Sequence, residues 1–297
     1  MKKPFFQGVC TALVTPFGAD GGLNEAMAVR LLRRQEENGV RAVVLSGTTG
    51  ESPTLSMEEK LRLFRLGQET LSPGTLVIAG TGSNDTEKAV ALSRQAEKIG
   101  VDALLVVSPY YNKATAEGLI AHYTKIAQAV ELPMILYNVP SRTGVDIPVE
   151  VYARLCQVPN IAGVKEASGN LPKIARIRQA CGPDFSVWSG NDDSIVPTLA
   201  LGGPGVVSVL SNLCPEETVA MVDAGLRGDF KTAGAMQCRF MPLIDALFRR
   251  VNPIPIKAAM DLVGLDCGPC RLPLTALPPE EKQELRRVME NCGIRVR

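Results

Sequence analysis

Residues 103–137, ALLVVSPYYNKATAEGLIAHYTKIAQAVELPMILY, contain one complete strand–helix–strand unit. The apolar runs at Ala103–Val107 and Met134–Tyr137 are continuous, which is typical of parallel strands buried on both faces. Between them, Thr115–Val130 has the pattern of a helix and ends before Pro133. This stretch therefore predicts a β/α unit in a parallel sheet.

The same alternation continues along most of the chain. Helices are predicted over Asn24–Asn38, which precedes Gly39, and over Glu87–Ile99, and Ser56 opens another helix with a capping box. The expected strands are Gly8–Thr15, Ala42–Ser46, Thr75–Ala79, Ala103–Val107, Met134–Tyr137, Ile161–Val164, Ser186–Trp188 and Gly205–Val209. Eight strands, each followed by a helix, predict an α/β protein with a (β/α)8 TIM barrel. An open doubly wound sheet is disfavoured because no Gly-x-Gly-x-x-Gly follows the first strand.

After Val209 the pattern changes to helices alone. They are predicted over Pro215–Leu226, Phe230–Val251, Ile254–Leu265 and Pro279–Asn291. The first of them can close the barrel. We therefore expect a catalytic barrel over residues 1–226 and a C-terminal helical region over residues 227–297.

Composition excludes several classes of protein. Of the 297 residues, 45% are apolar and 21% are charged, as in globular proteins with a large core. The net charge is +1 and no basic block occurs, which argues against nucleic acid or anionic membrane as a partner. No run of about 18 apolar residues predicts a membrane span. Met1–Thr15 lacks the pattern of a signal peptide, so we expect a cytoplasmic protein.

The eight cysteines are scattered, so we expect them to be reduced. Cys267 and Cys270 have the spacing of a redox dithiol, but they do not lead from a strand into a helix. A plain loop with two thiols is favoured there over a redox or metal role, and the sequence leaves open whether the two are joined. The single histidine, His122, is expected to be a half-exposed helix residue, and a metal site would need further ligands.

In such barrels the active site forms where the strands end. Lys165 directly follows the buried strand Ile161–Val164, so loss of hydration is expected to disfavour its charged form and free its amine to attack a carbonyl. The alternative is a lysine paired with a carboxylate at the rim. Tyr137 ends the neighbouring strand, where a phenol can transfer protons, although a tyrosine that only packs in the core is the alternative.

Two further strand ends carry polar groups. Thr48 and Thr49 lie in a glycine-flanked loop whose N–H groups suit a carboxylate and whose hydroxyls suit a proton relay. Arg142 lies in a loop beyond the fifth strand, and its guanidinium suits bidentate capture of a carboxylate. A tight loop and a solvated surface arginine are the respective alternatives.

The strand-end motifs, taken together and in order, closely resemble those of the dihydrodipicolinate synthase family. They are Gly47-Thr48-Thr49-Gly50-Glu51, Pro109-Tyr110-Tyr111-Asn112, Tyr137-Asn138-Val139-Pro140-Ser141-Arg142-Thr143-Gly144 and Gly163-Val164-Lys165-Glu166-Ala167. The resemblance covers nearly the whole chain and includes Asn252-Pro253-Ile254-Pro255-Ile256-Lys257 in the C-terminal region.

The resemblance implies a condensation of pyruvate with aspartate 4-semialdehyde on the way to diaminopimelate and lysine. It implies that Lys165 forms the pyruvate imine and that no cofactor or metal is needed. The resemblance further implies a proton relay of Tyr137, Thr48 and a neighbouring subunit's Tyr111. It implies a pyruvate site with Thr49, Val207 and Gly190, and a site for the carboxylate of the semialdehyde at Arg142. The family usually forms homotetramers built from tight dimers.

Two other functions compete with this interpretation. N-acetylneuraminate lyases and keto-deoxy-sugar-acid aldolases share the lysine and the tyrosine, but the paired Thr48 and Thr49 together with Arg142 favour the synthase. A catalytically silent barrel that binds a metabolite is the third hypothesis. The intact Lys165 and Tyr137 argue against it, because a binding protein needs no proton relay.

The departures from the family lie in its regulatory region. In lysine-inhibited members the positions that bind lysine match Ser52, Met57, Lys60, Asn84, Lys88 and Tyr110. Met57 and Lys60 stand where those members have histidine, and Lys88 stands where they have an acidic residue that holds the ligand's amine. Because like charges repel, we expect feedback inhibition by lysine to be weak or absent.

Overall fold

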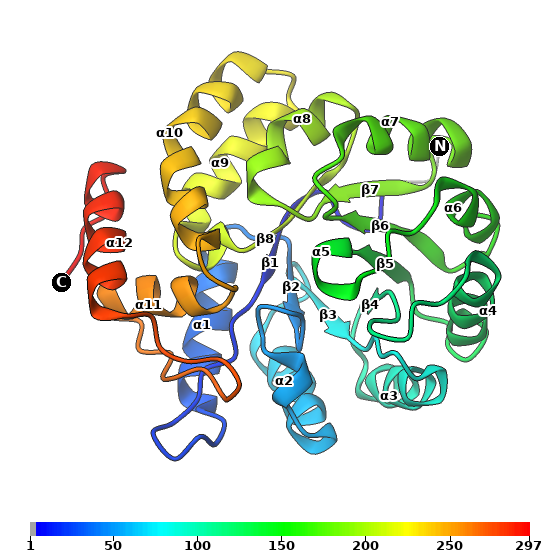
Figure 1. Cartoon of the computed structure of the whole chain (residues 1–297), viewed down its shortest axis with the longest axis horizontal. Helices are drawn as coiled ribbons and strands as arrows, with labels where there is room; N and C mark the ends of the chain where they lie inside the picture. Colours follow the sequence, from blue (N-terminus) through cyan, green and yellow to red (C-terminus); the bar gives the residue numbers. More distant parts are fainter. Residues whose placement is uncertain (1–3) are drawn as a thin grey trace.

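In the computed structural model, which describes residues 4–297, eight parallel strands close into a barrel in sequence order (Figure 1). Residues 1–3 of the expected barrel region lie outside the described residues. The strands are β1 (Gly8–Ala12), β2 (Ala42–Leu45), β3 (Leu76–Gly80), β4 (Ala103–Val107), β5 (Met134–Asn138), β6 (Ile161–Glu166), β7 (Ser186–Ser189) and β8 (Gly205–Ser208). Pairing of β1 with β8 closes the cylinder, which confirms the predicted (β/α)8 barrel.

Helices surround the barrel and extend beyond it at one side (Figure 1). Those between or after the strands are α1 (Glu25–Glu37), α2 (Met57–Thr70), α3 (Thr86–Ile99), α4 (Ala116–Ala127), α5 (Pro140–Thr143), α6 (Val149–Leu155), α7 (Leu171–Cys181), α8 (Ile195–Ala200) and α9 (Pro215–Leu226). The chain ends with α10 (Phe230–Phe248), α11 (Ile254–Leu262) and α12 (Pro279–Asn291). α10 packs against α9, and α12 packs against α10 and α11. Short 3₁₀ turns are η1 (Ser52–Thr54), η2 (Asp192–Ser194) and η3 (Leu210–Asn212). Within residues 4–297, no helix combines the length and apolar character needed to cross a membrane.

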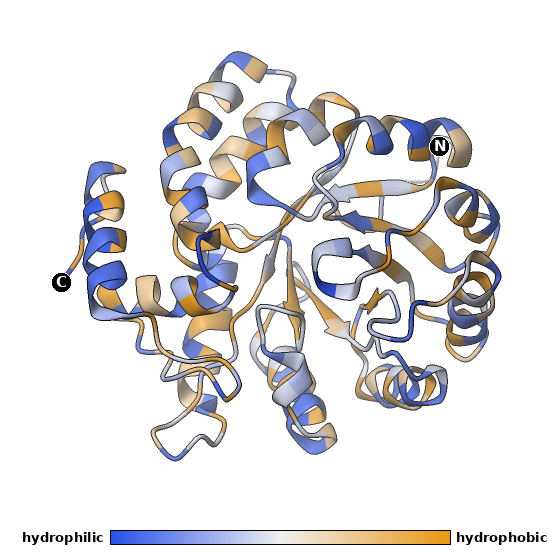
Figure 2. Cartoon of the chain, viewed as in Figure 1, coloured by the Kyte–Doolittle hydropathy of each residue, from blue (hydrophilic) through white to orange (hydrophobic). Residues whose placement is uncertain are grey.

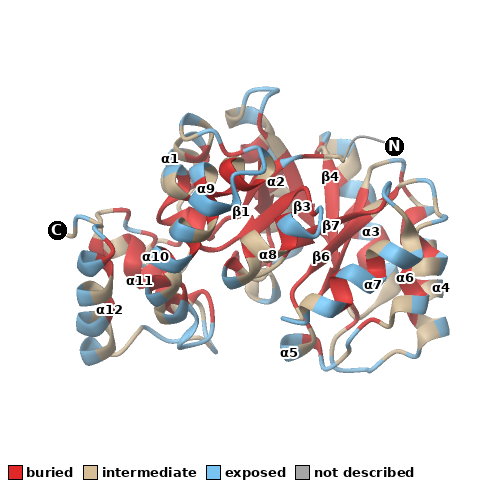
Figure 3. Cartoon of the chain, turned by 90° about the horizontal axis from the view of Figure 1, so that it is seen from above, coloured by how far each residue is buried: buried red, intermediate tan, exposed pale blue. Residues whose placement is uncertain are grey.

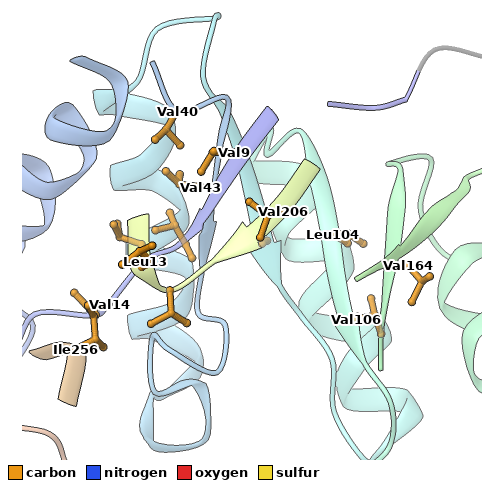
Figure 4. Packing of buried hydrophobic residues seen from close by; sticks show 14 of the residues in the cluster. Val9, Leu13, Val14, Val40, Val43, Leu104, Val106, Val164, Val206 and Ile256 are labelled. Atoms are coloured by element: carbon orange, nitrogen blue, oxygen red, sulfur yellow. The ribbon is translucent and has the colours of Figure 1, made fainter. Parts of the chain in front are cut away.

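Each strand contributes side chains to two separate cores, because successive residues face opposite sides. Val43, Val164 and Val206 lie in the outer core between the strands and the helices (Figure 4). Their neighbours Val44 and Val207 belong to a second core inside the barrel. Both faces are therefore apolar, as the hydropathy colouring of the strands shows in Figure 2, and the strands are buried in Figure 3. This explains the continuous apolar runs in the sequence.

The interior of the barrel is filled on the side where the strands begin. Phe6, just before β1, stacks on the fully buried Trp188 with ring centroids 4.8 Å apart. A Cβ at Gly163 would lie 2.8 Å from the Trp188 ring and 2.1 Å from the Ser186 carbonyl oxygen, so only glycine fits there. Because this end is packed, the open end of the interior is where the strands finish.

Several element boundaries differ from those predicted. β1 stops at Ala12, three residues before the predicted end, whereas β6 continues through Lys165 to Glu166. β6 is longer than predicted because Lys165 still pairs with both neighbouring strands, with Tyr137 of β5 and Trp188 of β7. α4 ends at Ala127, earlier than predicted, and the Asn160 amide donates to the carbonyl oxygens of Ala127, Val130 and Leu132 beyond this end.

Two local predictions have clear outcomes. Ser56 caps α2 as predicted, because its hydroxyl accepts from the Glu59 N–H and its own N–H donates to the Glu59 carboxylate. The prediction for His122 was wrong: its side chain is 5% exposed, against α3, and its Nδ1 is hydrogen-bonded to the Thr86 hydroxyl. Burial lowers the pKa of His122 to about 4.

The cysteines of residues 4–297 are all free, as expected. Cys267 and Cys270 lie in the loop between α11 and α12, outside any helix or strand, and they are not joined to each other. Burial is the main cause that raises the pKa of both thiols, to about 12 for Cys267 and about 11 for Cys270. Raised pKa values disfavour the reactive thiolate, so this segment is a plain loop with two thiols.

Candidate active site

Lys165 and Tyr137 lie side by side on neighbouring strands at the open end of the barrel. They are register partners in the β5–β6 ladder, and the Lys165 Nζ lies 4.3 Å from the centroid of the Tyr137 ring. Lys165 is 4% exposed. Lys173 and Lys257 are buried in ion pairs, but among the described residues Lys165 has no such partner. The alternative of a lysine paired at the rim is therefore wrong.

A polar contact on the outer face of the same two strands fixes this arrangement. Asn138 and Glu166 are the next register pair, and the Asn138 Nδ2 lies 3.0 Å from each Glu166 carboxylate oxygen. Glu166 also accepts from the Ser168 N–H at 2.8 Å and the Tyr152 hydroxyl at 3.4 Å. Burial, followed by the nearby Glu166 charge, raises the pKa of Tyr152. Hydrogen bonds thus hold the carboxylate of Glu166 on the outer face of the strands.

The strand ends surround a cavity of about 490 Å³. It brings together six of the eight residues predicted for the site: Thr48, Thr49, Tyr137, Arg142, Lys165 and Gly190. Val207 lies deeper, in the core inside the barrel, and Val209 lines the cavity instead. Tyr111 is outside the cavity, with 90% of its surface exposed and a left-handed backbone (φ 73°).

A second cavity of about 670 Å³ adjoins the first and shares Thr48, Tyr137, Val139 and Arg142 with it. Its lining includes all six positions matched to the lysine site: Ser52, Met57, Lys60, Asn84, Lys88 and Tyr110. Burial lowers the pKa of Lys60. Most residues that the sequence pointed to therefore line two adjoining cavities that share Tyr137, whereas Tyr111 and Val207 line neither.

The loop that carries Thr48 and Thr49 is held by a buried ion pair with the C-terminal helices. Glu51, in a left-handed conformation, accepts from the Lys257 Nζ at 2.8 Å and from the Arg271 N–H at 2.8 Å. The Glu51 and Lys257 side chains are 1% and 3% exposed. Lys257 donates in addition to the Pro269 carbonyl oxygen. The threonine loop is thus anchored to α11 and the loop after it.

Asn252 joins this loop to Arg142. Its Nδ2 donates to the Thr49 hydroxyl at 2.9 Å, and its backbone carbonyl oxygen accepts from the Arg142 Nη2 at 2.9 Å. Arg142 lies in the short helix α5, not in the predicted loop, and Gly144 ends this helix in a left-handed conformation. No role was predicted for Asn252 or Lys257 from the sequence. Both residues lie in the family-like segment Asn252–Lys257, which could have drawn attention to them. No nearby residue in the sequence, however, indicates which side chains they contact.

Asp192 is buried next to the turn that follows β8. It is 1% exposed, and its Oδ2 accepts from the N–H groups of Val209 and Leu210 at 3.0 and 2.8 Å. Burial raises its pKa, and the Ser208 hydroxyl, these hydrogen bonds and the charge of Lys165 offset only part of this rise. Its contacts hold the turn after β8, next to Val209 in the cavity wall.

Comparison with known proteins gives a consistent result over the full length. The model of the dihydrodipicolinate synthetase family matches residues 5–292. A 4-hydroxy-tetrahydrodipicolinate synthase of Acetivibrio thermocellus is 42% identical, over 99% of this chain and 100% of the relative. A crystal structure of the enzyme from Cyanidioschyzon merolae with lysine bound is 44% identical and superposes with a TM-score of 0.96, covering 99% and 100% of the two chains. The chloride-inhibited enzyme of Acinetobacter baumannii complexed with pyruvate is 39% identical with a TM-score of 0.95, covering 97% and 99%.

Removal of one partner from the buried Glu51–Lys257 pair is expected to destabilise the protein. Lys257→Met leaves the Glu51 carboxylate buried without its cation, so we expect the free energy of unfolding in denaturant to fall by about 3–5 kcal/mol. The matched control is Arg62→Met, which breaks the part-exposed Arg62–Glu25 pair and should cost less than about 1 kcal/mol. Equal small losses in both variants would contradict an anchoring role for Lys257.

Proposed function

The chain belongs to the dihydrodipicolinate synthetase family, and we propose that Lys165 is the nucleophile of its reaction. That reaction is the condensation of pyruvate with L-aspartate 4-semialdehyde to 4-hydroxy-tetrahydrodipicolinate, in lysine and diaminopimelate biosynthesis. One observation carries the proposal: a buried lysine, which has no carboxylate partner within residues 4–297, lies against a tyrosine in an open cavity. The relatives' names do not favour the sugar-acid aldolase.

The chemistry follows from the position of the amine. The Lys165 Nζ adds to the keto carbon of pyruvate, and loss of water gives the imine. The iminium withdraws electrons from the adjacent methyl group, so loss of a proton there gives an enamine that adds to the aldehyde carbon. Attack of the semialdehyde's own amine on the imine carbon then closes the ring and releases Lys165. The ring of Tyr137 lies against Nζ, and its hydroxyl is the group we propose to carry the protons.

We propose the remaining roles from the lining of the cavity. Thr48 would continue the relay from Tyr137, and Thr49 would position the pyruvate carboxylate, with Gly190 beside it and Val207 beneath. Arg142, whose guanidinium is tied to Asn252, would bind the carboxylate of the semialdehyde. These groups surround Lys165 without a carboxylate that would compete for either substrate.

Tyr111 supports a site completed by a second subunit. A bulky residue held at positive φ costs of order 1–3 kcal/mol, and such strain clusters at functional sites. Tyr111 does not line the cavity of its own chain, and 90% of its surface is exposed. We propose that it enters the relay of a neighbouring subunit in a cytoplasmic homotetramer of two tight dimers. The exposure of Met57 and Leu272, at 44% and 79%, is consistent with further subunit contacts.

Reduction with borohydride in the presence of pyruvate tests the nucleophile. We expect a stable pyruvate adduct on Lys165, found by peptide mass spectrometry, because an imine is reduced to an amine that no longer hydrolyses. Lys165→Met should abolish the adduct, whereas Lys125→Met, at an exposed ion pair, should keep it. An adduct on another lysine, or none in the wild-type enzyme, would favour a different nucleophile or a silent binding protein.

Arg142→Ala tests the second substrate. Loss of a charge-assisted contact to a carboxylate costs about 2–4 kcal/mol, so kcat/KM for aspartate semialdehyde should fall roughly 30- to 1000-fold. The borohydride-trapped pyruvate adduct should still form, because the imine forms elsewhere in the cavity. Unchanged steady-state kinetics with the semialdehyde would count against this role and against that substrate.

The second cavity generates a prediction about regulation. We propose that lysine inhibits weakly or not at all, because the ammonium groups of Lys60 and Lys88 line the cavity that corresponds to the lysine site. Steady-state rates should stay near the uninhibited value at sub-millimolar lysine. Lys88→Glu should increase the inhibition by restoring a negative charge, whereas Lys98→Glu on the same helix should not. Strong inhibition of the wild-type enzyme would refute the proposal.

A further inference from the structure

Asn252 carries a buried oxygen that no described residue uses. The residue is 5% exposed, and its Oδ1 has no hydrogen-bond partner in the described chain. Its Nδ2 donates to the Thr49 hydroxyl, and its backbone oxygen accepts from Arg142. Buried polar atoms in native proteins are almost always hydrogen-bonded, so an unused acceptor indicates a donor that arrives from elsewhere.

The substrate cavity gives the missing donor a route to Asn252. Asn252 lines this cavity together with Lys165, Thr49 and Arg142. Its contacts to Thr49 and Arg142 place it between the two positions proposed for the substrate carboxylates. Asn252 is therefore adjacent to both proposed carboxylate positions.

We propose that the Asn252 Oδ1 accepts a hydrogen bond from the α-ammonium group of aspartate semialdehyde and so selects an amino aldehyde over a plain one. This inference rests on the proposed function. The ammonium is bonded to the carbon that bears the carboxylate, so it must lie close to the group that binds this carboxylate. Arg142 is that group, and its Nη2 is bonded to Asn252 itself. An ammonium has three donors and no acceptor, which matches a free amide oxygen.

The composition of the cavity strengthens the assignment. Its described lining contains no aspartate or glutamate, so the ammonium must be held by neutral acceptors. The charged side chains present are all cationic: Arg142, Lys165, Arg249 and Arg250. A neutral acceptor also suits the chemistry, because the same nitrogen must lose its proton before it closes the ring. A carboxylate in contact would raise the pKa of the ammonium and oppose that step.

The test compares two aldehydes that differ only in the ammonium group. Succinic semialdehyde has a hydrogen atom where aspartate semialdehyde has the amine. Its inhibition constant against aspartate semialdehyde is measured on the pyruvate-loaded enzyme. In Asn252→Ala we expect the KM for aspartate semialdehyde to rise about 10-fold or more, as for loss of a hydrogen bond to a charged group. The inhibition constant of succinic semialdehyde should change less than about 3-fold, since it never made this contact.

Two further variants separate recognition from a structural effect. Asn252→Asp keeps an acceptor but loses the donor to Thr49, so it should retain the preference for the amino aldehyde. Asn191→Ala removes the other asparagine in the lining and should keep the wild-type ratio of the two constants. Equal losses with both aldehydes in Asn252→Ala would mean that Asn252 only positions Thr49 and Arg142. No loss with either would mean that water satisfies the oxygen. Both results overturn the inference.

The proposed function is checked separately in the wild-type enzyme. The pyruvate adduct on Lys165 and turnover of aspartate semialdehyde establish the reaction before any variant is compared. If the adduct forms but the semialdehyde is not consumed, the proposed function fails. If turnover is normal and the ratio in Asn252→Ala is unchanged, only the inference about Asn252 fails.

Discussion

The register between β5 and β6 is the constraint on which the active site depends. A shift of one residue would turn Lys165 out of the barrel, because neighbouring side chains of a strand face opposite sides. The Asn138–Glu166 contact sits on the outer face, one step along the same ladder as Tyr137 and Lys165. A buried carboxylate that accepts several hydrogen bonds is satisfied in one register only. The polar contact behind the strands thus specifies the arrangement of the reacting groups in front of them.

A second constraint comes from the C-terminal helices. A buried pair such as Glu51–Lys257 adds little net stability compared with apolar residues, since both charges must leave water. Its value lies in specificity: the Glu51 backbone, and with it the threonine loop, can adopt few positions that keep the pair intact. Asn252 extends the same attachment to Thr49 and Arg142. The helices beyond the barrel therefore define the geometry of the mouth.

The sequence predicted the barrel and most of the site because both depend on local patterns. Continuous apolar runs identify strands buried on both faces, and the residues after them fall at one mouth, as Lys165 and Tyr137 do. Contacts between segments that are far apart in the chain could not be predicted from the sequence. Glu51 and Lys257 are 206 residues apart, and nothing near either residue indicates the other. His122 was misplaced for the same reason, since its burial comes from packing of α4 against α3.

The placement of carboxylates explains how one cavity can serve both substrates. Glu166 and Asp192 are buried near Lys165, yet hydrogen bonds hold Glu166 behind the strands and Asp192 in the turn after β8. The described lining of the cavity is left with cationic and neutral groups. Such a lining attracts the carboxylates of both substrates and leaves the Lys165 amine without an ion-pair partner. It also removes any anionic partner for the semialdehyde's ammonium, so recognition of that group requires a neutral acceptor, which the free oxygen of Asn252 supplies.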